Sequence, residues 1–176
     1  MPETAPSPEI AVIGAGYAGM ACAQRLAEAG RTVKLFDKGR GPGGRSSTRR
    51  SEVGRFDHGA PFFAVSDPDF TAVVDLWRGH GVAAPWEGRF IAVDGSGTPE
   101  QPSLPAVTVG MPGMNGILRW LGEGLDIAFG VRVERIVRDG DAYRLIAENG
   151  ADLGLFGQVV VAVPSVQAVP LLAQTG

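Results

Sequence analysis

Three glycines and one aspartate near the N-terminus have the types and spacing that bind a dinucleotide. Gly14, Gly16 and Gly19 follow a short apolar segment, and Asp37 lies 18 residues after the last of them. In this pattern the first glycine allows a sharp turn, the second lets a pyrophosphate approach the backbone, and the third lets a helix pack close to a sheet. The amides at the helix start favour the phosphate charge, and a carboxylate at Asp37 can accept hydrogen bonds from ribose hydroxyls.

The segments around these residues predict a strand, a helix and a second strand. We expect a strand at 10–14 that is buried on both faces, a helix at 17–29 that Gly30 ends, and a strand at 32–37. The crossover should be right-handed. A glycine-rich turn can also be purely structural, but the order of elements and the distance to the acid favour dinucleotide binding.

Downstream, the pattern of apolar residues and turn residues predicts short strands and helices. We expect a short helix to start at Ser46–Thr48, a helix to start at Ser66–Pro68, and a hairpin-like pairing of 82–86 with 89–93. Further strands are predicted at 53–57, 106–109, 125–128, 131–137, 143–148 and 158–163, and further helices after 111–116 and from 166 to 172. The strand at 158–163 reads as apolar on both faces and is predicted to be fully buried.

Length and charge narrow the class of protein. The chain has 176 residues, 44% of them hydrophobic, with a formal net charge of −3. This length suits one domain with a small insertion, and the acidic balance disfavours a nucleic-acid partner. The Pro-rich residues 1–8 are predicted to be a disordered leader without the basic region of a signal peptide. Gln24 and Arg25 interrupt the apolar stretch that follows, so we expect a cytoplasmic protein with no membrane partner.

Few residues suit catalysis by side chains alone. The single Cys22 excludes an internal disulfide and is predicted to be a small buried residue of the first helix. His58 and His80 are too few for a convincing metal site, so no metal is predicted. Asp57 is expected to order its own loop, and the catalytic residues stay unknown at this stage.

Aromatic and basic residues leave two interpretations open. Trp77 and Trp86 could line an aromatic substrate cavity, although core packing is the commoner role, and Trp120 is expected in the core. Five arginines crowd into one stretch and could neutralise a phosphate-bearing ligand. They are Arg40, Arg45, Arg49, Arg50 and Arg55. For Arg49 and Arg50 a solvated loop is the simpler interpretation.

Three segments resemble the FAD-dependent amine-oxidase superfamily and, within it, the renalase-like bacterial FAD/NAD(P)-dependent oxidoreductases. They are Gly14–Gly19 with Asp37, Gly43–Thr48, and Phe56–Phe63. The resemblance implies an α/β fold: a Rossmann-like FAD-binding domain of the glutathione-reductase/amine-oxidase type, formed by 9–65 and 110–176. Residues 66–109 would be part of an inserted α+β substrate domain. Members of this family are about twice as long, which suits two domains, and the resemblance implies that the chain would correspond to their N-terminal half.

The resemblance also implies which residues contact FAD. Four residues of the first glycine-rich turn would hold the pyrophosphate: Gly14, Gly16, Ala18 and Gly19. Four that follow the second strand would hold the adenosine ribose, the phosphates and the ribityl chain: Asp37, Lys38, Gly44 and Arg45. Ala60, Pro61 and Phe62 would border the flavin ring, and the backbone of Val133 would meet the adenine.

The implied activity is oxidation of a small reduced substrate by hydride transfer to FAD, with oxygen as the final acceptor. The substrate would be a dihydronicotinamide-type dinucleotide, related to NAD(P)H, or an amine. Two alternatives stay open. Asp37 also suits an NAD(P)-dependent dehydrogenase, and the length suits a non-catalytic, truncated dinucleotide-binding fragment. Such a fragment would expose an apolar edge and could form homo-oligomers.

Overall fold

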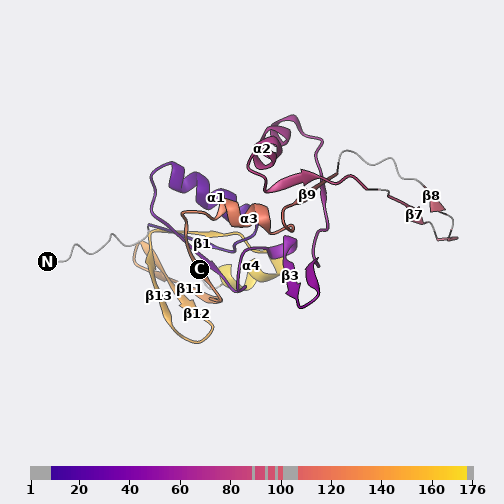
Figure 1. The fold of residues 1–176 in the computed structure, drawn as a ribbon. Helices are drawn as coiled ribbons and strands as arrows, with labels where there is room; N and C mark the ends of the chain where they lie inside the picture. The colour runs from indigo at the N-terminus through magenta and orange to yellow at the C-terminus, as the bar shows by residue number, and fades with distance from the viewer. Residues whose placement is uncertain (1–8, 89, 94, 98, 101–106, 174–176) are drawn as a thin grey trace. The chain divides into compact units, whose positions relative to one another are not determined.

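The computed structural model describes residues 9–173 except 89, 94, 98 and 101–106, so the predicted leader at 1–8 lies outside the described residues (Figure 1). The chain divides into two compact units. The first combines the residues up to Arg45 with those from Leu118 onward, and the second is Ser46–Ile117. The predicted division into an FAD-binding domain and a substrate-domain insertion refers to function and stays a prediction.

A four-stranded parallel sheet forms the centre of the first unit. Its order is β10-β2-β1-β14, and its strands are β1 (Ile10–Ile13), β2 (Val33–Asp37), β10 (Asp126–Phe129) and β14 (Gln158–Val161). Helix α1 (Tyr17–Glu28) connects β1 to β2, as the sequence predicts. All four residues of β1 are buried, because this strand has a neighbour on each side and packed layers on both faces.

Strand β14 corrects one prediction. It is shorter than the predicted 158–163, and its three valines are only half-buried. The physical reason is its place in the sheet, since β14 lies at the edge of the described strands and pairs with β1 alone. An apolar run therefore does not distinguish a central strand from an edge strand.

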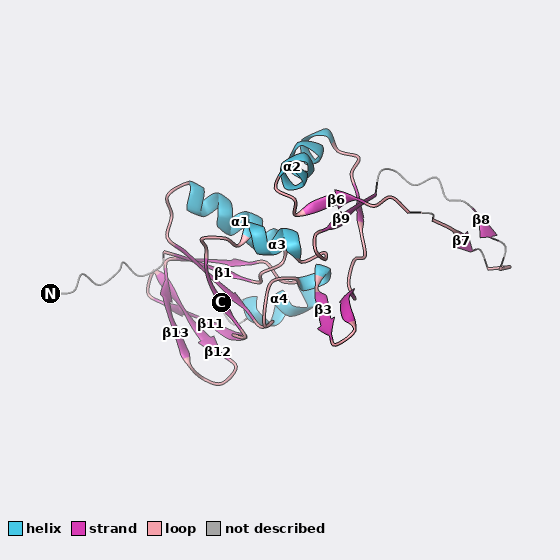
Figure 2. Cartoon of the chain, viewed as in Figure 1, coloured by secondary structure: helices cyan, strands magenta, loops and turns pink. Residues whose placement is uncertain are grey.

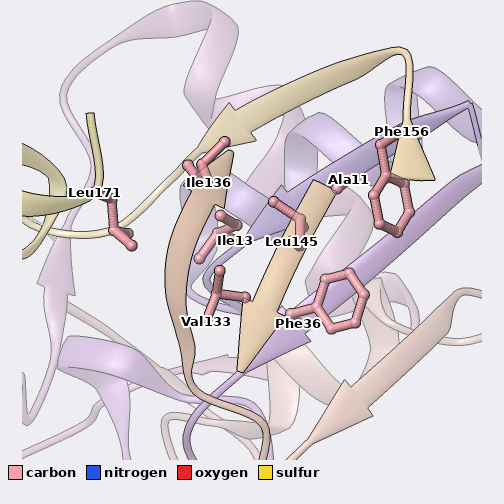
Figure 3. Close-up of a cluster of buried hydrophobic side chains, with 8 residues drawn as sticks. All are labelled: Ala11, Ile13, Phe36, Val133, Ile136, Leu145, Phe156 and Leu171. Atoms are coloured by element: carbon pink, nitrogen blue, oxygen red, sulfur yellow. The ribbon is translucent and has the colours of Figure 1, made fainter. Parts of the chain in front are cut away.

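A three-stranded antiparallel sheet covers the face of the parallel sheet opposite α1 (Figure 1). It consists of β11 (Val133–Asp139), β12 (Ala142–Ala147) and β13 (Asp152–Phe156), of which β13 was not predicted. Figure 3 shows the core between the two sheets, to which helix α4 (Ser165–Leu172) contributes one residue. The cluster contains Ala11, Ile13, Phe36, Val133, Ile136, Leu145, Phe156 and Leu171. Alternate residues of β1 and β2 supply its first three members, as the two-residue period of a strand requires.

The second unit contains small antiparallel sheets and one long helix (Figure 2). Strands β3 (Thr48–Ser51) and β4 (Gly54–Asp57) form a hairpin. Strands β5 (Phe63–Ala64), β9 (Val107–Gly110) and β6 (Ala83–Pro85) form a sheet in that order, and α2 (Pro68–Gly79) lies against β6. The Asp67 side chain accepts a hydrogen bond from the Phe70 amide and so caps α2, at the predicted helix start.

Two local predictions in this unit are wrong. A 3₁₀ turn at Gly44–Ser46 precedes a strand that starts at Thr48, where a helix start was predicted. The predicted pairing of 82–86 with 89–93 does not form: β6 pairs with β9, and β7 (Ala92–Val93) pairs with β8 (Pro99–Glu100). Strand β9 is a largely buried, four-residue partner that follows more than 20 residues after β6, so tertiary pairing overrides the local turn signal.

Burial settles how the aromatic residues pack. Trp77 is 5% exposed and meets Phe63 and Phe70 edge to face, so it belongs to the core of the second unit. Trp86 is 44% exposed and contacts Phe62 and Phe90. Trp120, on α3 (Gly116–Leu121), and Cys22 are half-buried rather than fully buried as predicted. Within the described ranges, no helix has both the length and the hydropathy to cross a membrane.

Candidate dinucleotide site

Two of the predicted glycines are required by the packing of the backbone itself. Gly14 has a φ of 109°, and a Cβ atom there would lie 2.8 Å from the carbonyl oxygen of Ala162. A Cβ atom on Gly19 would lie 1.8 Å from the carbonyl oxygen of Gly14. A side chain at either position would therefore push α1 and the end of β14 away from the turn. These two glycines shape the turn whether or not a ligand binds.

Gly16 differs from these two glycines, because neither its backbone conformation nor a contact within the protein requires a glycine at this position. Its φ of −86° suits any residue, and no protein atom lies within 4 Å of the position that its Cβ would take. Gly16 is the N-cap of α1, provides no side-chain cap, and no acidic residue occupies the first turn. The exposed Ala18 also keeps this turn small. An open volume at a helix N-terminus without an acidic or capping side chain fits the phosphate of a dinucleotide.

The second glycine-rich segment lies against the first. The Gly43 amide donates a hydrogen bond to the Ala15 carbonyl oxygen over 3.4 Å. Gly44 has a φ of 52°, and its Cβ would lie 3.4 Å from the Cα of Gly16. The structure thus brings Gly16 and Gly44 together, although 27 residues separate them. A ligand held against Gly16 would meet a second stretch of bare backbone at Gly44.

Asp37 ties these two segments together. At the end of β2, its Oδ2 accepts a hydrogen bond from the Ala15 amide over 2.6 Å, and its Oδ1 accepts one from the Gly39 amide over 2.6 Å. A carboxylate has about four lone-pair sites, so two hydrogen bonds leave capacity for a ribose hydroxyl. The structure therefore shows a bracing role that the sequence analysis did not include, and the predicted contact with ribose stays a prediction.

The remaining predicted residues of the first unit lie in different surroundings. The Lys38 ammonium donates a hydrogen bond to the Gln167 side chain over 2.9 Å, which holds it on α4. Arg45 is exposed, and no acidic side chain of the described residues forms an ion pair with it. Val133 is 6% exposed and points into the core between the two sheets (Figure 3). The predicted adenine contact would therefore involve its backbone alone.

Ala60, Pro61 and Phe62 belong to the second unit, between β4 and β5. Pro61 is exposed, Ala60 is half-buried, and Phe62 packs against Trp86 and Phe90 with ring centroids 5.8 and 6.1 Å away. Their predicted place beside a flavin ring stays a prediction.

Asp57 fastens the β3–β4 hairpin to a distant loop instead of ordering its own. Its Oδ1 accepts hydrogen bonds from the Thr48 hydroxyl over 2.5 Å and from the Met114 amide over 3.0 Å. The Asn115 amide donates to the Thr48 hydroxyl over 3.3 Å. The neighbouring His58 is exposed. No group of three or more metal-ligating side chains occurs among the described residues.

Sequence reasoning missed three backbone contributors, namely Ala15, Gly39 and Gly43. A signal existed for Gly39, because an Asp followed two residues later by a glycine often accepts the amide of that glycine. The amide of Ala15 and that of Gly43 carried no such local signal, since their partners come from other segments of the chain. The hydrogen bonds of Asp57 with the Met114 amide and of Thr48 with the Asn115 amide were equally hidden, since these residues meet only through tertiary structure.

The comparisons with known proteins concern the fold of the chain. A family model described as an NAD(P)-binding Rossmann-like domain matches residues 12–78. The structure of a putrescine oxidase variant superposes with a TM-score of 0.73 at 14% identity, over 93% of this chain and 59% of that chain. Wild-type putrescine oxidase with bound putrescine gives a TM-score of 0.72 over 93% of this chain and 60% of that chain. The chain therefore has an α/β Rossmann-like dinucleotide-binding fold of the amine-oxidase type with additional antiparallel sheets, which confirms the predicted fold class.

Curated relatives match a shorter part of the chain. The 4,4'-diapophytoene desaturase (4,4'-diaponeurosporene-forming) of Staphylococcus haemolyticus is 43% identical over 58 residues, which are 33% of this chain and 12% of the desaturase. The Staphylococcus aureus enzyme of the same description is 39% identical over 59 residues, also 12% of its length. The chain thus spans a small part of these desaturases and about three fifths of putrescine oxidase.

Proposed function

We propose that this chain is the dinucleotide-binding part of an FAD-dependent oxidoreductase. The proposal rests on one observation about Gly16. No contact within the protein requires a glycine there, yet Gly16 stands at the start of α1, which has no side-chain cap, and lies beside Gly44. Together with Ala18, these residues form a backbone cradle that a pyrophosphate would fill. The resemblance of the second glycine-rich segment, Gly43–Thr48, to flavin enzymes favours FAD over NAD(P).

Each residue of the cradle has a definite task in this proposal. The amides at the start of α1 would bind the pyrophosphate oxygens. Asp37 holds the two loops in register through Ala15 and Gly39, and its remaining lone pairs would accept from the ribose. The charge of Arg45 would balance that of the phosphates. When bound, FAD supplies the hydride acceptor, and the protein supplies orientation and electrostatics.

The substrate class follows from similarity alone. We propose a small reduced substrate, either a dihydronicotinamide-type dinucleotide or an amine, with oxygen as the final acceptor. The renalase-like resemblance favours the first class, and the structural likeness to putrescine oxidase, whose substrate is an amine, favours the second. Steady-state assays of the FAD-loaded protein with both classes would separate them.

The substitution Gly16→Ser tests the cradle directly. A serine at an N-cap should keep or raise the free energy of unfolding by a few tenths of a kcal/mol, because no protein atom opposes its Cβ. Its side chain would occupy the volume proposed for the pyrophosphate. We therefore expect FAD affinity to fall at least about tenfold, measured by quenching of flavin fluorescence, while the melting temperature is unchanged or higher.

Gly79→Ser is the matched control, since Gly79 in the second unit also has open space at its Cβ position. This variant should bind FAD as the wild type does. Equal FAD affinity in the wild type and in Gly16→Ser would contradict the proposed cradle. A wild type that binds no FAD but binds NADH in the same titration would favour the second candidate, an NAD(P)-dependent dehydrogenase, to which Asp37 and the matching family model also point.

A further inference from the structure

The β3–β4 hairpin places two arginines directly opposite each other. In its register Arg50 pairs with Arg55, and both side chains are exposed. Like charges at directly opposite positions of an antiparallel pair destabilise it. The hairpin therefore holds two cationic groups that repel each other, and an anion bound between them would relieve this repulsion.

No acidic side chain among the described residues forms an ion pair with either arginine. The acid on the same face of the hairpin is Asp57, which forms no ion pair with either arginine and whose Oδ1 accepts from the Thr48 hydroxyl and the Met114 amide. Glu52, in the connecting turn, is exposed and forms no ion pair within the described part of the chain. The charges of Arg50 and Arg55 are thus available to a ligand.

The base of the hairpin is held in place. Thr48 and Asp57 form the next pair on the face of Arg50 and Arg55, because side chains of one face recur every second residue. Their contacts with Met114 and Asn115 fix that end of the hairpin. Opposite Cβ atoms lie about 4.5–5.5 Å apart, so two guanidinium groups can donate to the oxygens of one tetrahedral anion.

We propose that Arg50 and Arg55 form a binding site for a phosphate group, which belongs to the second unit and does not depend on the proposed FAD chemistry. The phosphate could belong to a soluble phosphorylated compound or to a phospholipid headgroup. Val53 at the turn is 86% exposed, so the hairpin also offers an apolar side chain at its tip. The two sources share one chemistry and are separated by experiment.

The test uses the double variant R50Q/R55Q and the matched control R135Q/R138Q. Arg135 and Arg138 are exposed residues of β11, so each double variant removes two positive charges from exposed strand positions. Calorimetric titration with pyrophosphate tests the soluble source, and sedimentation with phosphatidylglycerol or phosphatidylcholine vesicles tests the lipid source. We expect the wild type to bind in at least one arm, R50Q/R55Q to bind at least about tenfold more weakly, and the control to match the wild type.

Without phosphate, R50Q/R55Q should unfold at the same or a higher temperature, because the opposed charges are gone. If it unfolds at a lower temperature, R50K/R55K replaces it: this variant keeps the charge, lacks the two-pronged donor geometry and should also bind more weakly. The proposal is overturned if the wild type binds neither pyrophosphate nor anionic vesicles, or if both double variants lose affinity equally. FAD binding should be unchanged in R50Q/R55Q. If the protein binds no FAD at all, the phosphate titrations still test the arginine site, because they use a different ligand.

Discussion

A single carboxylate holds the candidate site together at the scale of the residue. Asp37 accepts from the amides of Ala15 and Gly39, and so connects the turn after β1 with the loop after β2. Both hydrogen bonds are short, at 2.6 Å, as favoured when the acceptor is an ionised carboxylate. The geometry of the cradle therefore depends on a side chain that the sequence pattern assigns to the ligand, and one residue combines a structural role with the proposed binding role.

The substitution Asp37→Asn separates these roles. Asparagine has an NH2 group in place of one carboxylate oxygen. This group would face the backbone N–H of Ala15 or Gly39, and two donors cannot form a hydrogen bond with each other. We expect the free energy of unfolding to fall by about 1–3 kcal/mol, measured by urea denaturation, together with a loss of FAD affinity. Unchanged stability with weaker FAD binding would show that Asp37 acts on the ligand alone.

At the scale of the element, the close contact of α1 with β1 depends on a position without a side chain. Because a Cβ on Gly19 would lie 1.8 Å from the Gly14 carbonyl oxygen, the helix can approach the strand only with glycine there. We expect Gly19→Ala to lower the free energy of unfolding by about 1–3 kcal/mol or more. Chemical denaturation measures the change, and a stability equal to that of Gly16→Ser would contradict this role.

The antiparallel sheet β11-β12-β13 carries a charged group whose effect depends on pH. The Gly154 amide and, next, the Arg144 guanidinium lower the pKa of Asp152 from its ordinary value. The carboxylate therefore stabilises the fold above its ordinary pKa, and this contribution disappears as the pH falls through the lower value of the folded state. The salt bridges of Arg144 to Asp152 and Asp139 lie on the surface, so the effect should be small.

We expect Asp152→Asn to melt at a slightly lower temperature than the wild type near neutral pH. The difference should shrink as the pH falls below about 5 and vanish in strong acid, because both proteins then carry a neutral group. Melting curves across this range measure it. Asp141→Asn, whose carboxylate forms no ion pair within the described residues, is the control and should show no comparable trend.

The same elements explain how far the sequence could predict the structure. The β1–α1–β2 unit was predictable because its signals are local: an apolar run, three spaced glycines and a terminal acid. The pairing of β6 with β9 and the edge position of β14 were not, since both depend on partners far along the chain. In the candidate site, Gly16 and Asp37 could be found from spacing, whereas the contact of Gly44 with Gly16 required the fold.

At the scale of the whole molecule, the two units use the chain differently. The second unit is one continuous stretch, Ser46–Ile117, whereas the first unit combines segments from both sides of it. The glycine cradle belongs to the first unit and the arginine pair to the second, so the two proposed sites can be tested with separate variants. Because the two sites share no residue, a loss of binding in one variant can be assigned to one site.

The register of β1 with β14 has a consequence for biosynthesis. Ile10 pairs with Gln158 and Ile13 with Val161, so β1 leaves the ribosome long before its partner β14 has been synthesised. Long-range pairing of this kind slows folding, and until it occurs the nascent chain exposes one edge of β1, whose four residues are all buried in the fold. We expect translation to complete the stretch 46–117 before β14 can pair with β1, so a chaperone would be most useful during this interval.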